Sequence, residues 1–550
     1  MKRARLLLLG AYVAVYLLPL GVRPLFVPDE YRYAEIPREM LAGGDWVVPR
    51  LAGFRYFEKP ALSYWVSAAS LALFGESAFG LRLPSALAAG LCAWLTALGV
   101  RRAGEGGGAS ILAAGVLLTS GLFFGVATYK TLDALFTLGV TASLVCAFLA
   151  GDGDGRRRLG LWALAGAAAG AAFLTKGLLG FALPAIVLAA FLTWERRWRI
   201  ALRHAWIAPL TAIGVVLPWS LAVARSDADF WPYFIWNEHV RRFASEDAQH
   251  VAPFWYYVPV LLGCAMPWVP LWPAVIAGLR ARTTTPLVRF ALCGLVFPFG
   301  LFTIARGKLA IYLLPCFPAL AILTALGLRA ELARSGRWLR AGLRAVAIAV
   351  AGVSLALAVT RLVLPRVVPV YGPGEGSRFA LVLLAALLAS LTWIAAARSR
   401  RPDRVLALAT LAAAPLYLAY PFAVPDLVLE RKAPGALLAR HADRLTGDAL
   451  VVSEARLAPA VSWHARRDDI LVLGGIGELR YGASRPDSQS RWLERVTTLR
   501  TLLEGQQPGR RAVLIADQDT YAEWAPRLPP PSLVDSLGNF VYAEYTSVRD

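Results

Sequence analysis

The sequence predicts a polytopic α-helical membrane protein that ends in a small α/β domain. Hydrophobic residues make up 57% of the 550 residues, and the mean hydropathy is +0.53. A soluble globular chain of this length is much less apolar. Segments of about 18–24 residues with almost no charge recur along the chain, and each is long enough to cross roughly 30 Å of hydrocarbon. The chain becomes more polar only near its C-terminus.

The apolar segments predict about 13 membrane spans. They cover residues 5–25, 79–100, 108–127, 131–150, 159–175, 177–194, 204–224, 254–279, 286–304, 309–328, 342–364, 378–397 and 404–421. The first segment follows Lys2, Arg3 and Arg5 and has the length of a signal peptide, but no small-residue cleavage site precedes Pro28. We therefore expect it to be retained as a helix.

Arginine clusters predict the orientation of the spans. The net charge is +20 and the pI is about 10.1. The arginines fall in alternate loops, at residues 101–102, 156–158, 196–199, 280–282, 329–340 and 398–404. This positive-inside pattern favours a cytoplasmic N-terminus, and it explains the positive charge without nucleic-acid binding. An odd number of spans then places the C-terminal region on the extracytoplasmic side of the membrane.

Residues 425–550 have the pattern of a small α/β domain, whereas residues 1–424 form the predicted membrane domain, with long loops at about 26–78 and 225–253. Strand-like runs cover Ala449–Ser453, Ile470–Leu473, Ala512–Ile515 and Phe540–Tyr545, and a helical pattern covers Arg491–Gly505. Such alternation is typical of an α/β domain. The five cysteines lie in or near apolar segments without metal-ligand spacing, so no disulfide framework is expected.

A cluster of charged residues directly follows the first apolar segment. Asp29 and Glu30 open a polar stretch from Pro28 to Pro60, which also contains Glu58 and Lys59. Carboxylates at a membrane boundary are costly to desolvate. The handling of a charged substrate at the bilayer surface therefore explains them better than a need to span lipid. Within this stretch, residues 32–41 have apolar residues at helical spacing, which predicts a helix lying flat on the membrane.

Four cations lie in short turns on the outer side, where the orientation rule disfavours them. They are Lys130, Lys176, Arg306 and Lys308. Together they could bind a phosphate or pyrophosphate at headgroup depth. The alternative is that each side chain merely extends along the interface to reach water.

Glu58 and His239 form a possible metal site, since a carboxylate and an imidazole can share a divalent cation. Their wide separation in the sequence leaves a hydrogen-bonded pair, or two unrelated residues, as the simpler alternatives. The chain contains no P-loop, Rossmann fingerprint, G-x-S-x-G or H-E-x-x-H motif. The predicted outer location of the polar residues also argues against a nucleotide cofactor.

The polar stretch resembles the first periplasmic loop of bacterial aminoarabinose transferases. Further matching motifs follow in the same order. They are Tyr129 with Leu132-Asp133, Thr175-Lys176-Gly177, Leu217-Pro218-Trp219, Asp229-Phe230-Trp231, Glu238 to Phe243, Ala252 to Tyr257, and Arg306 to Leu309 with Tyr312. The resemblance covers residues 5–320 well. In the C-terminal domain it thins to short pieces such as Gly477 to Gly482.

The resemblance implies an inverting lipid-to-lipid glycosyltransferase with the GT-C fold. Such an enzyme moves a sugar, here 4-amino-4-deoxy-L-arabinose, from undecaprenyl phosphate to lipid A, a modification linked to polymyxin resistance. The catalytic residues implied by the matching motifs are Asp29, Asp133 and Lys59. Asp29 would orient the acceptor or act as a base. Lys59 would contact the carrier phosphate and stabilise its developing charge.

The resemblance also implies the remaining site residues and partners. Those expected to bind the donor phosphate are Lys59, Lys176, Arg242, Arg306, Lys308 and Tyr312. Glu58 and His239 match positions that hold a zinc-like ion, so a divalent metal, zinc, is the expected cofactor, with no nucleotide. The expected partners are the undecaprenyl-phosphate-linked sugar, lipid A or another lipid acceptor, and the membrane. The chain is expected to be a monomer that does not bind nucleic acid.

Three departures from the family pattern leave the sugar and the acceptor open. Tyr31 stands where a Thr is expected, Ala310-Ile311 where Pro-Thr is expected, and Arg306 where a Lys is usual. One alternative is a GT-C transferase that moves another polyprenyl-phosphate-linked sugar to lipopolysaccharide core or protein. A more remote alternative is a transporter of lipid-linked sugars. A transporter is expected to show internal repeats and charges near mid-membrane, neither of which the sequence shows.

Overall fold

The computed structural model of the chain describes residues 2–241, 250–280, 282–363, 370–507 and 509–546. Its contacts divide the chain into two compact units. The helical unit comprises Met1–Leu20 and Arg82–Ala423, and the α/β unit comprises Gly21–Leu81 and Val424–Asp550. We expected residues 26–78 to be a loop of the membrane domain, but their contacts place them in the same unit as the C-terminal segment.

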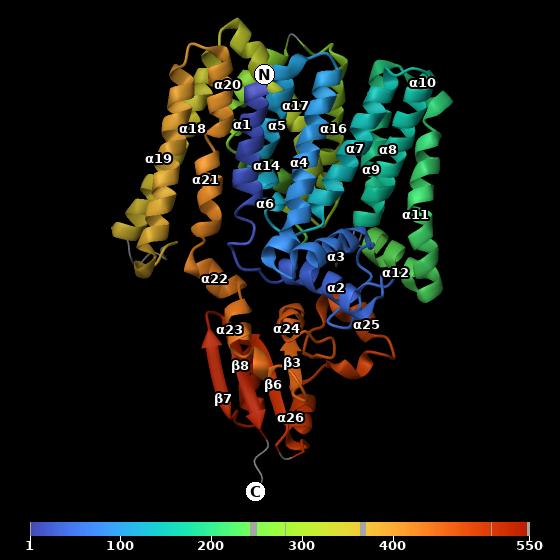
Figure 1. Cartoon of the computed structure of the whole chain (residues 1–550), viewed down its shortest axis with the longest axis vertical. Helices are drawn as coiled ribbons and strands as arrows, with labels where there is room; N and C mark the ends of the chain where they lie inside the picture. Colours follow the sequence, from blue (N-terminus) through green and yellow to red (C-terminus); the bar gives the residue numbers. More distant parts are fainter. Residues whose placement is uncertain (1, 242–249, 281, 364–369, 508, 547–550) are drawn as a thin grey trace. The chain divides into compact units, whose positions relative to one another are not determined.

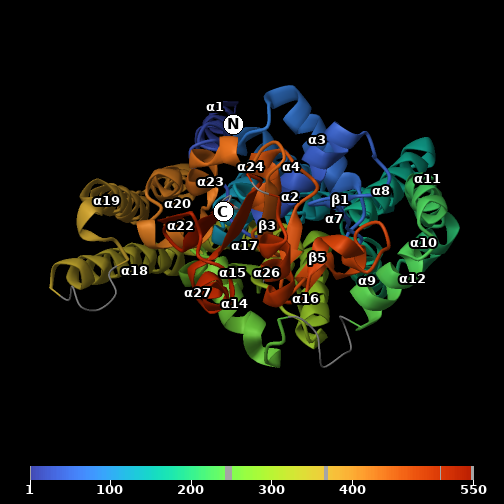
Figure 2. The same cartoon turned by 90° about the horizontal axis from the view of Figure 1, so that it is seen from below.

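The helical unit consists of α-helices and short 3-10 and π segments (Figure 1). Its elements are α1 (Lys2–Tyr12), η1 (Val13–Leu17), α4 (Ala78–Arg102), α5 (Gly106–Leu118), α6 (Gly121–Ala127), α7 (Asp133–Gly151), α8 (Gly155–Lys176), α9 (Leu179–Glu195), α10 (Trp198–His204), α11 (Ile207–Ser226), α12 (Phe230–Ile235), η2 (Trp236–Arg241), η3 (Phe254–Tyr256), α14 (Tyr257–Cys264), η4 (Val269–Leu271), α15 (Trp272–Leu279), α16 (Pro286–Ile304), η5 (Ala310–Cys316), α17 (Phe317–Arg334), α18 (Arg337–Leu362), η6 (Pro373–Glu375), α19 (Gly376–Arg398), α20 (Pro402–Leu411), α21 (Ala414–Ala419) and η7 (Tyr420–Phe422). Figures 1 and 2 both show α18 beside α19 and α8 beside α11.

The described residues contain 9 helices that are long and apolar enough to cross a membrane, or up to 11 if each of two bent pairs is one span. The bent pairs are Gly106–Leu118 with Gly121–Ala127 and Phe254–Cys264 with Val269–Leu279. The two remaining predicted spans, residues 5–25 and 177–194, correspond to shorter helices. The first ends early because α1 changes to a π-helix at Val13 and Pro19 cannot continue a helix. The second, Leu179–Glu195, is an apolar helix of 17 residues.

Small residues allow the helices of this unit to pack closely. A Cβ atom built on Gly278 of α15 would lie 2.0 Å from the carbonyl oxygen of Gly327 in α17. A side chain at either position would therefore push the two helices apart. Close approach of backbones at small residues is typical of helix pairs in membranes.

The C-terminal part of the α/β unit contains a six-stranded sheet flanked by helices (Figure 1). Its elements are α22 (Asp426–Lys432), α23 (Gly435–Arg440), η8 (Ala442–Arg444), β3 (Leu450–Glu454), α24 (Ala458–Ala465), β4 (Leu471–Leu473), η9 (Gly477–Leu479), α25 (Arg480–Ala483), η10 (Gln489–Arg491), β5 (Trp492–Leu493), α26 (Val496–Glu504), β6 (Arg511–Asp517), α27 (Gln518–Trp524), η11 (Ala525–Arg527), β7 (Leu533–Leu537) and β8 (Phe540–Thr546). The predicted α/β fold and its four strands are confirmed. The helix predicted over Arg491–Gly505 is confirmed from Val496 to Glu504, whereas Trp492 and Leu493 form strand β5.

The sheet has the strand order β5-β4-β3-β6-β8-β7. Strands β5, β4, β3 and β6 are parallel, and β8 and β7 add an antiparallel edge. Strands β4 and β5 follow β3 in the sequence and are added on one side of it, and the next strand, β6, pairs with β3 on its other side. The strand order therefore reverses between β3 and β6, which is where open α/β sheets form binding crevices.

The polar stretch of the sequence folds as part of this unit. It forms α2 (Asp29–Gly43), the short hairpin of β1 (Arg50–Leu51) and β2 (Phe54–Arg55), and α3 (Leu62–Phe74). The prediction that residues 32–41 are helical is confirmed, and their placement flat on a membrane stays a prediction. Tyr33, Ala34, Ile36 and Met40 are buried within the protein, and Ala34 packs in a core with residues of α23, α24 and the sheet.

Tyr31, one of the departures from the family pattern, joins α2 to α24. Its hydroxyl oxygen lies 3.0 Å from Nε2 of His464, and its side chain is buried. Burial lowers the pKa of His464 to about 4, so this imidazole is neutral near pH 7. A tyrosine here therefore has a hydrogen-bond partner in the C-terminal segment, which a threonine is too short to reach in the same way.

Candidate active site

Asp29 is the first residue of α2, and its side chain is 41% exposed. One turn later, Nη1 of Arg32 lies 3.2 Å from Oδ1 of Asp29. The Nε atom of the same guanidinium lies 2.8 Å from Oε2 of Glu478 in η9. Arg32 thus pairs with the Asp29 carboxylate on one side and with Glu478 of the C-terminal segment on the other. The Asp29 carboxylate is therefore oriented by Arg32 and remains open to solvent.

Glu478 extends this polar network to Lys59. The Tyr56 hydroxyl is buried and lies 3.2 Å from Glu478 Oε2 and 3.4 Å from Glu58 Oε2. Lys59 donates from Nζ to the Glu58 backbone oxygen at 2.6 Å, and Nζ lies 3.9 Å from Glu58 Oε2. Burial, followed by the charges of Glu58 and Glu478, raises the pKa of Tyr56, which remains a neutral donor.

The network brings together three predicted residues, Asp29, Glu58 and Lys59, within the α/β unit. Sequence reasoning missed Glu478 as the residue that connects them. The only signal for it was the short match from Gly477 to Gly482, because a single glutamate in a polar segment carries no chemistry by itself.

Glu30 has a different role from its neighbour Asp29. Its side chain is fully buried and makes a bidentate ion pair with Arg23, with N···O distances of 2.8 and 3.0 Å. The backbone N–H of Phe26 donates to the same carboxylate at 3.0 Å. Two parallel hydrogen bonds between a guanidinium group and a carboxylate fix the relative orientation of the two side chains. Glu30 therefore fixes the backbone that leads into α2, whereas the Asp29 side chain is open to solvent.

Within the helical unit, the structure brings together Asp133, Lys176 and Tyr312. Asp133 begins α7 and Lys176 ends α8, and their side chains form an ion pair that is almost fully buried. The Lys176 ammonium also lies 4.5 Å from the centroid of the Tyr312 ring, in η5, a distance typical of a cation–π contact. Helix α7 packs against both α8 and η5, and the contact of Lys176 with Tyr312 links α8 to η5.

The segment that carries Arg306 and Lys308 is held by a short backbone ladder. Gly307 pairs with Val251 in an isolated antiparallel bridge, and Lys308 N donates to His250 O at 2.9 Å. The Lys308 side chain is buried, and its ammonium donates to the carbonyl of Ala305 at the end of α16. Lys308 thus caps a helix here, and a role in phosphate binding stays a prediction, as it does for Arg306.

The remaining predicted residues are less fully defined. Arg242 lies outside the described residues, and His239 lies in η2, where the structure describes the backbone but not the side chain. Across the described ranges, no group of three or more His, Cys, Asp or Glu side chains is placed to hold a metal ion. The proposed pairing of Glu58 with His239 therefore stays a prediction.

Comparisons with known proteins define the class to which the chain belongs. A family model described as dolichyl-phosphate-mannose-protein mannosyltransferase matches residues 2–234, and one described as arabinosyl transferase ArnT, C-terminal domain, matches residues 429–544. The crystal structure of ArnT from Cupriavidus metallidurans bound to undecaprenyl phosphate superposes with a TM-score of 0.81 at 26% identity, covering 98% of this chain and 97% of that one. The chain is thus a membrane-embedded glycosyltransferase with the GT-C fold.

Two curated relatives narrow the class to one family. An undecaprenyl phosphate-alpha-4-amino-4-deoxy-L-arabinose arabinosyl transferase of Pseudomonas paraeruginosa is 39% identical over 92% of each chain. A protein of the same name from Pectobacterium carotovorum is 37% identical over 98% of each chain. The chain belongs to this family of arabinosyl transferases, which confirms the resemblance found in its motifs.

Proposed function

We propose that this protein transfers 4-amino-4-deoxy-L-arabinose from undecaprenyl phosphate to lipid A. The observation that carries the proposal is its similarity, over nearly the full length of both chains, to the Pseudomonas relative that bears this donor and sugar in its name. The structural match to an ArnT bound to undecaprenyl phosphate supports the same carrier. The family's modification of lipid A links the proposed activity to polymyxin resistance.

The proposed reaction is a direct displacement at the anomeric carbon of the sugar. An oxygen of the acceptor phosphate forms the new bond to this carbon as the bond to the carrier phosphate breaks, and the electron pair leaves with undecaprenyl phosphate. The anomeric configuration inverts. Because a phosphate acceptor is already ionised, Asp29 has no proton that it must remove. Its exposed, Arg32-oriented carboxylate instead positions the acceptor or the sugar hydroxyls.

Charge stabilisation at the carrier phosphate is the second part of the proposal. Lys59 is 17% exposed, and the Glu58 backbone oxygen at 2.6 Å holds its ammonium in place, so the cation is positioned before a phosphate binds. Lys176, Arg242, Arg306, Lys308 and Tyr312 are the further candidates for binding the donor phosphate. A preorganised cation stabilises the charge that develops on a leaving phosphate.

Replacing Lys59 with alanine is expected to weaken the use of the donor more than the use of the acceptor. The variant loses a cation that is proposed to contact the carrier phosphate and not the acceptor, so kcat/KM for the donor is expected to fall about 100-fold. The KM for lipid A is expected to change less than threefold. Steady-state kinetics on purified lipids, with each substrate varied in turn, measures both values. Equal losses for the two substrates would contradict the role given to Lys59.

A zinc-like ion at Glu58 and His239 is a further proposal, supported by the family resemblance alone. Of this pair, the structure describes the side chain of Glu58, which accepts a hydrogen bond from Tyr56. No step of the proposed reaction uses a metal. If the ion is required, dialysis against a strong chelator lowers turnover at least tenfold, and added zinc restores it. The proposal would be overturned if elemental analysis of the purified protein found less than one tenth of a metal ion per molecule.

We also propose that the chain lies in the bacterial inner membrane with its active site and C-terminus in the periplasm. The arginine clusters in alternate loops support this orientation. Alkaline phosphatase fused after the C-terminus is expected to be active, and a green fluorescent protein fused at the same point is expected to stay dark. Fluorescence of the second fusion would show a cytoplasmic C-terminus and exclude the proposed orientation.

A further inference from the structure

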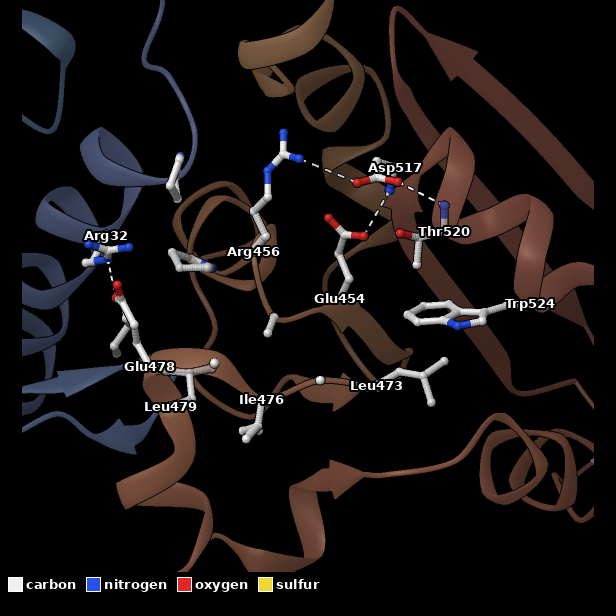
Figure 3. Close-up of a pocket in the computed structure, with 16 residues that line it drawn as sticks. Arg32, Glu454, Arg456, Leu473, Ile476, Glu478, Leu479, Asp517, Thr520 and Trp524 are labelled. Carbon is white, nitrogen blue, oxygen red and sulfur yellow. Dashed lines mark hydrogen bonds and ion pairs between the residues drawn. The ribbon is translucent and has the colours of Figure 1, made fainter. Parts of the chain in front are cut away.

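The α/β unit contains a cavity of about 480 Å³ to which the proposed reaction has assigned no ligand (Figure 3). It lies at the carboxyl ends of β3 and β6, where Glu454 and Asp517 end the strands, and beside the turn that follows β4. This is the point at which the strand order of the sheet reverses. Both the position and the volume are typical of small-molecule binding sites in open α/β sheets.

One carboxylate oxygen of Glu454, Oε1, faces the cavity without a hydrogen-bond donor among the described residues, whereas the other side of the carboxylate is held by the Asp517 backbone and the Thr520 side chain. The residue is 7% exposed and lines the cavity. Its Oε2 atom accepts from the backbone N–H of Asp517 at 3.3 Å, and its Oε1 atom is buried. Burial, followed by the neighbouring Asp517, raises the pKa of Glu454. A buried carboxylate oxygen without a donor is costly, so a ligand that brings a donor would relieve this cost.

The other charged groups of the cavity are engaged with one another. Asp517 accepts from the backbone N–H of Thr520 at 2.9 Å and pairs with Arg456 at 3.5 Å. At the opposite end of the cavity, Arg32 pairs with Glu478 (Figure 3). The lining thus contains three carboxylates and two guanidinium groups. Each guanidinium group pairs with one carboxylate, which leaves the Glu454 carboxylate without a guanidinium partner. The surplus is negative and favours a ligand with a positive charge.

The rest of the lining fits a sugar ring. Leu473, Ile476 and Trp524 supply an apolar surface beside Glu454. A sugar presents C–H groups to such a surface and hydroxyl or amine donors to carboxylates. Because Arg32 and Glu478 belong both to the cavity and to the network that holds Asp29, a sugar bound here adjoins the candidate active site.

We propose that this cavity binds the amine-bearing sugar headgroup of the lipid substrate, with the ammonium on Glu454. The inference rests on the proposed function, because it takes the transferred sugar to be an amino sugar. It assigns recognition of the amine to the C-terminal segment, and it makes Glu454 a specificity residue that does not touch the carrier lipid.

The test compares substrates with and without the sugar, using the full chain in lipid nanodiscs. Glu454→Gln keeps the shape of the side chain and removes its charge. It is expected to raise the KM for undecaprenyl phosphate-4-amino-4-deoxy-L-arabinose about tenfold, because a charge-assisted hydrogen bond is lost. The inhibition constant of undecaprenyl phosphate, which lacks the sugar, is expected to stay within twofold. Glu504→Gln, an exposed glutamate of the same unit paired with Arg500, is the matched control and changes neither value.

A second variant fills the cavity without touching a charged group. A Cβ atom built on Gly475 meets no atom within 4 Å, and Gly475 lines the cavity. Gly475→Leu is therefore expected to fold normally and to raise the donor KM like Glu454→Gln. An unchanged donor KM in both variants would overturn the proposal, and so would an equal rise in the donor KM and in the inhibition constant of undecaprenyl phosphate.

Direct binding of the free sugar separates this proposal from the proposed function. Saturation-transfer NMR with free 4-amino-4-deoxy-L-arabinose is expected to show binding to the wild-type chain and none to Gly475→Leu. Neutral L-arabinose is expected to bind at least fivefold more weakly. A wild-type chain that binds the amino sugar but does not transfer it would contradict the proposed function alone. A chain that transfers the sugar but binds equally well with the cavity filled would contradict the cavity site alone.

Discussion

Replacing Asp29 with asparagine is expected to lower the turnover of the transferase about 1,000-fold or more. Asparagine keeps the size of the side chain but removes its negative charge. In the wild-type chain this charge lies on a carboxylate that Arg32 orients, with Nη1 of Arg32 3.2 Å from Oδ1 of Asp29. Because the Asp29 side chain is 41% exposed, the protein is expected to insert and fold with an unchanged melting temperature. Mass spectrometry of the lipid products measures the transfer, and a thermal shift assay measures the folding.

Asp487 is the matched control for this experiment. It lies in the same unit, its side chain is 40% exposed, and it pairs with one arginine, Arg55, at 3.0 Å. Asp487→Asn is expected to keep full activity, since its carboxylate is equally exposed and lies outside the Asp29 network. Turnover near the wild-type rate in Asp29→Asn, or an equal loss in both variants, would remove Asp29 from the mechanism.

Replacing Asp133 with asparagine is expected to lower both stability and activity. The change leaves the buried Lys176 ammonium without its ion-pair partner, which typically costs about 3–5 kcal/mol. It also frees Lys176 to move away from Tyr312, so turnover is expected to fall about 100-fold. Asp152→Asn is the control, because Asp152 follows the other end of α7 and its exposed side chain pairs with Arg197.

A double variant separates the two effects. Asp133→Asn combined with Lys176→Met removes both charges, so the melting temperature is expected to recover at least half of its loss. Activity is expected to stay low, because the cation that faces Tyr312 is absent. If the double variant regained both stability and activity, the pair would be a packing feature of the helices and not part of the site.

The membrane class was predictable because hydropathy depends on local composition. Charge-free segments of about 20 residues have few alternatives to a membrane helix. Breaks inside such segments are harder to predict. Pro19 ends the first apolar run, bends break the runs at residues 106–127 and 254–279, and α9 has 17 residues. The described part of the chain therefore contains 9 to 11 helices long and apolar enough to cross a membrane, where about 13 were expected.

The α/β segment was predictable where its strands are long and apolar. Strands β3, β6 and β8 are buried along most of their length, and the sequence shows them as apolar runs. Strand β5 has two residues and β7 is largely exposed at the sheet edge, so neither has a clear pattern. The helix at residues 29–43 was predicted in part, but its apolar face fits a protein core as well as a membrane surface.

Site residues were predictable only where a motif carried them. Asp29 and Lys59 lie in a dense polar stretch that resembles a known loop, whereas Glu478 and Glu454 are single glutamates far along the chain. Their roles depend on tertiary contacts, which Glu478 makes with Arg32 and Tyr56 and Glu454 makes at a cavity beside the carboxyl ends of β3 and β6. Local sequence contains no information about such partners.

The most direct test of the account is transfer by the purified full chain in nanodiscs that contain undecaprenyl phosphate-4-amino-4-deoxy-L-arabinose and lipid A. The account predicts that mass spectrometry detects lipid A carrying one added aminopentose, together with an equal amount of free undecaprenyl phosphate. Release of undecaprenyl phosphate with free sugar and unmodified lipid A, or no consumption of this donor at all, would contradict it.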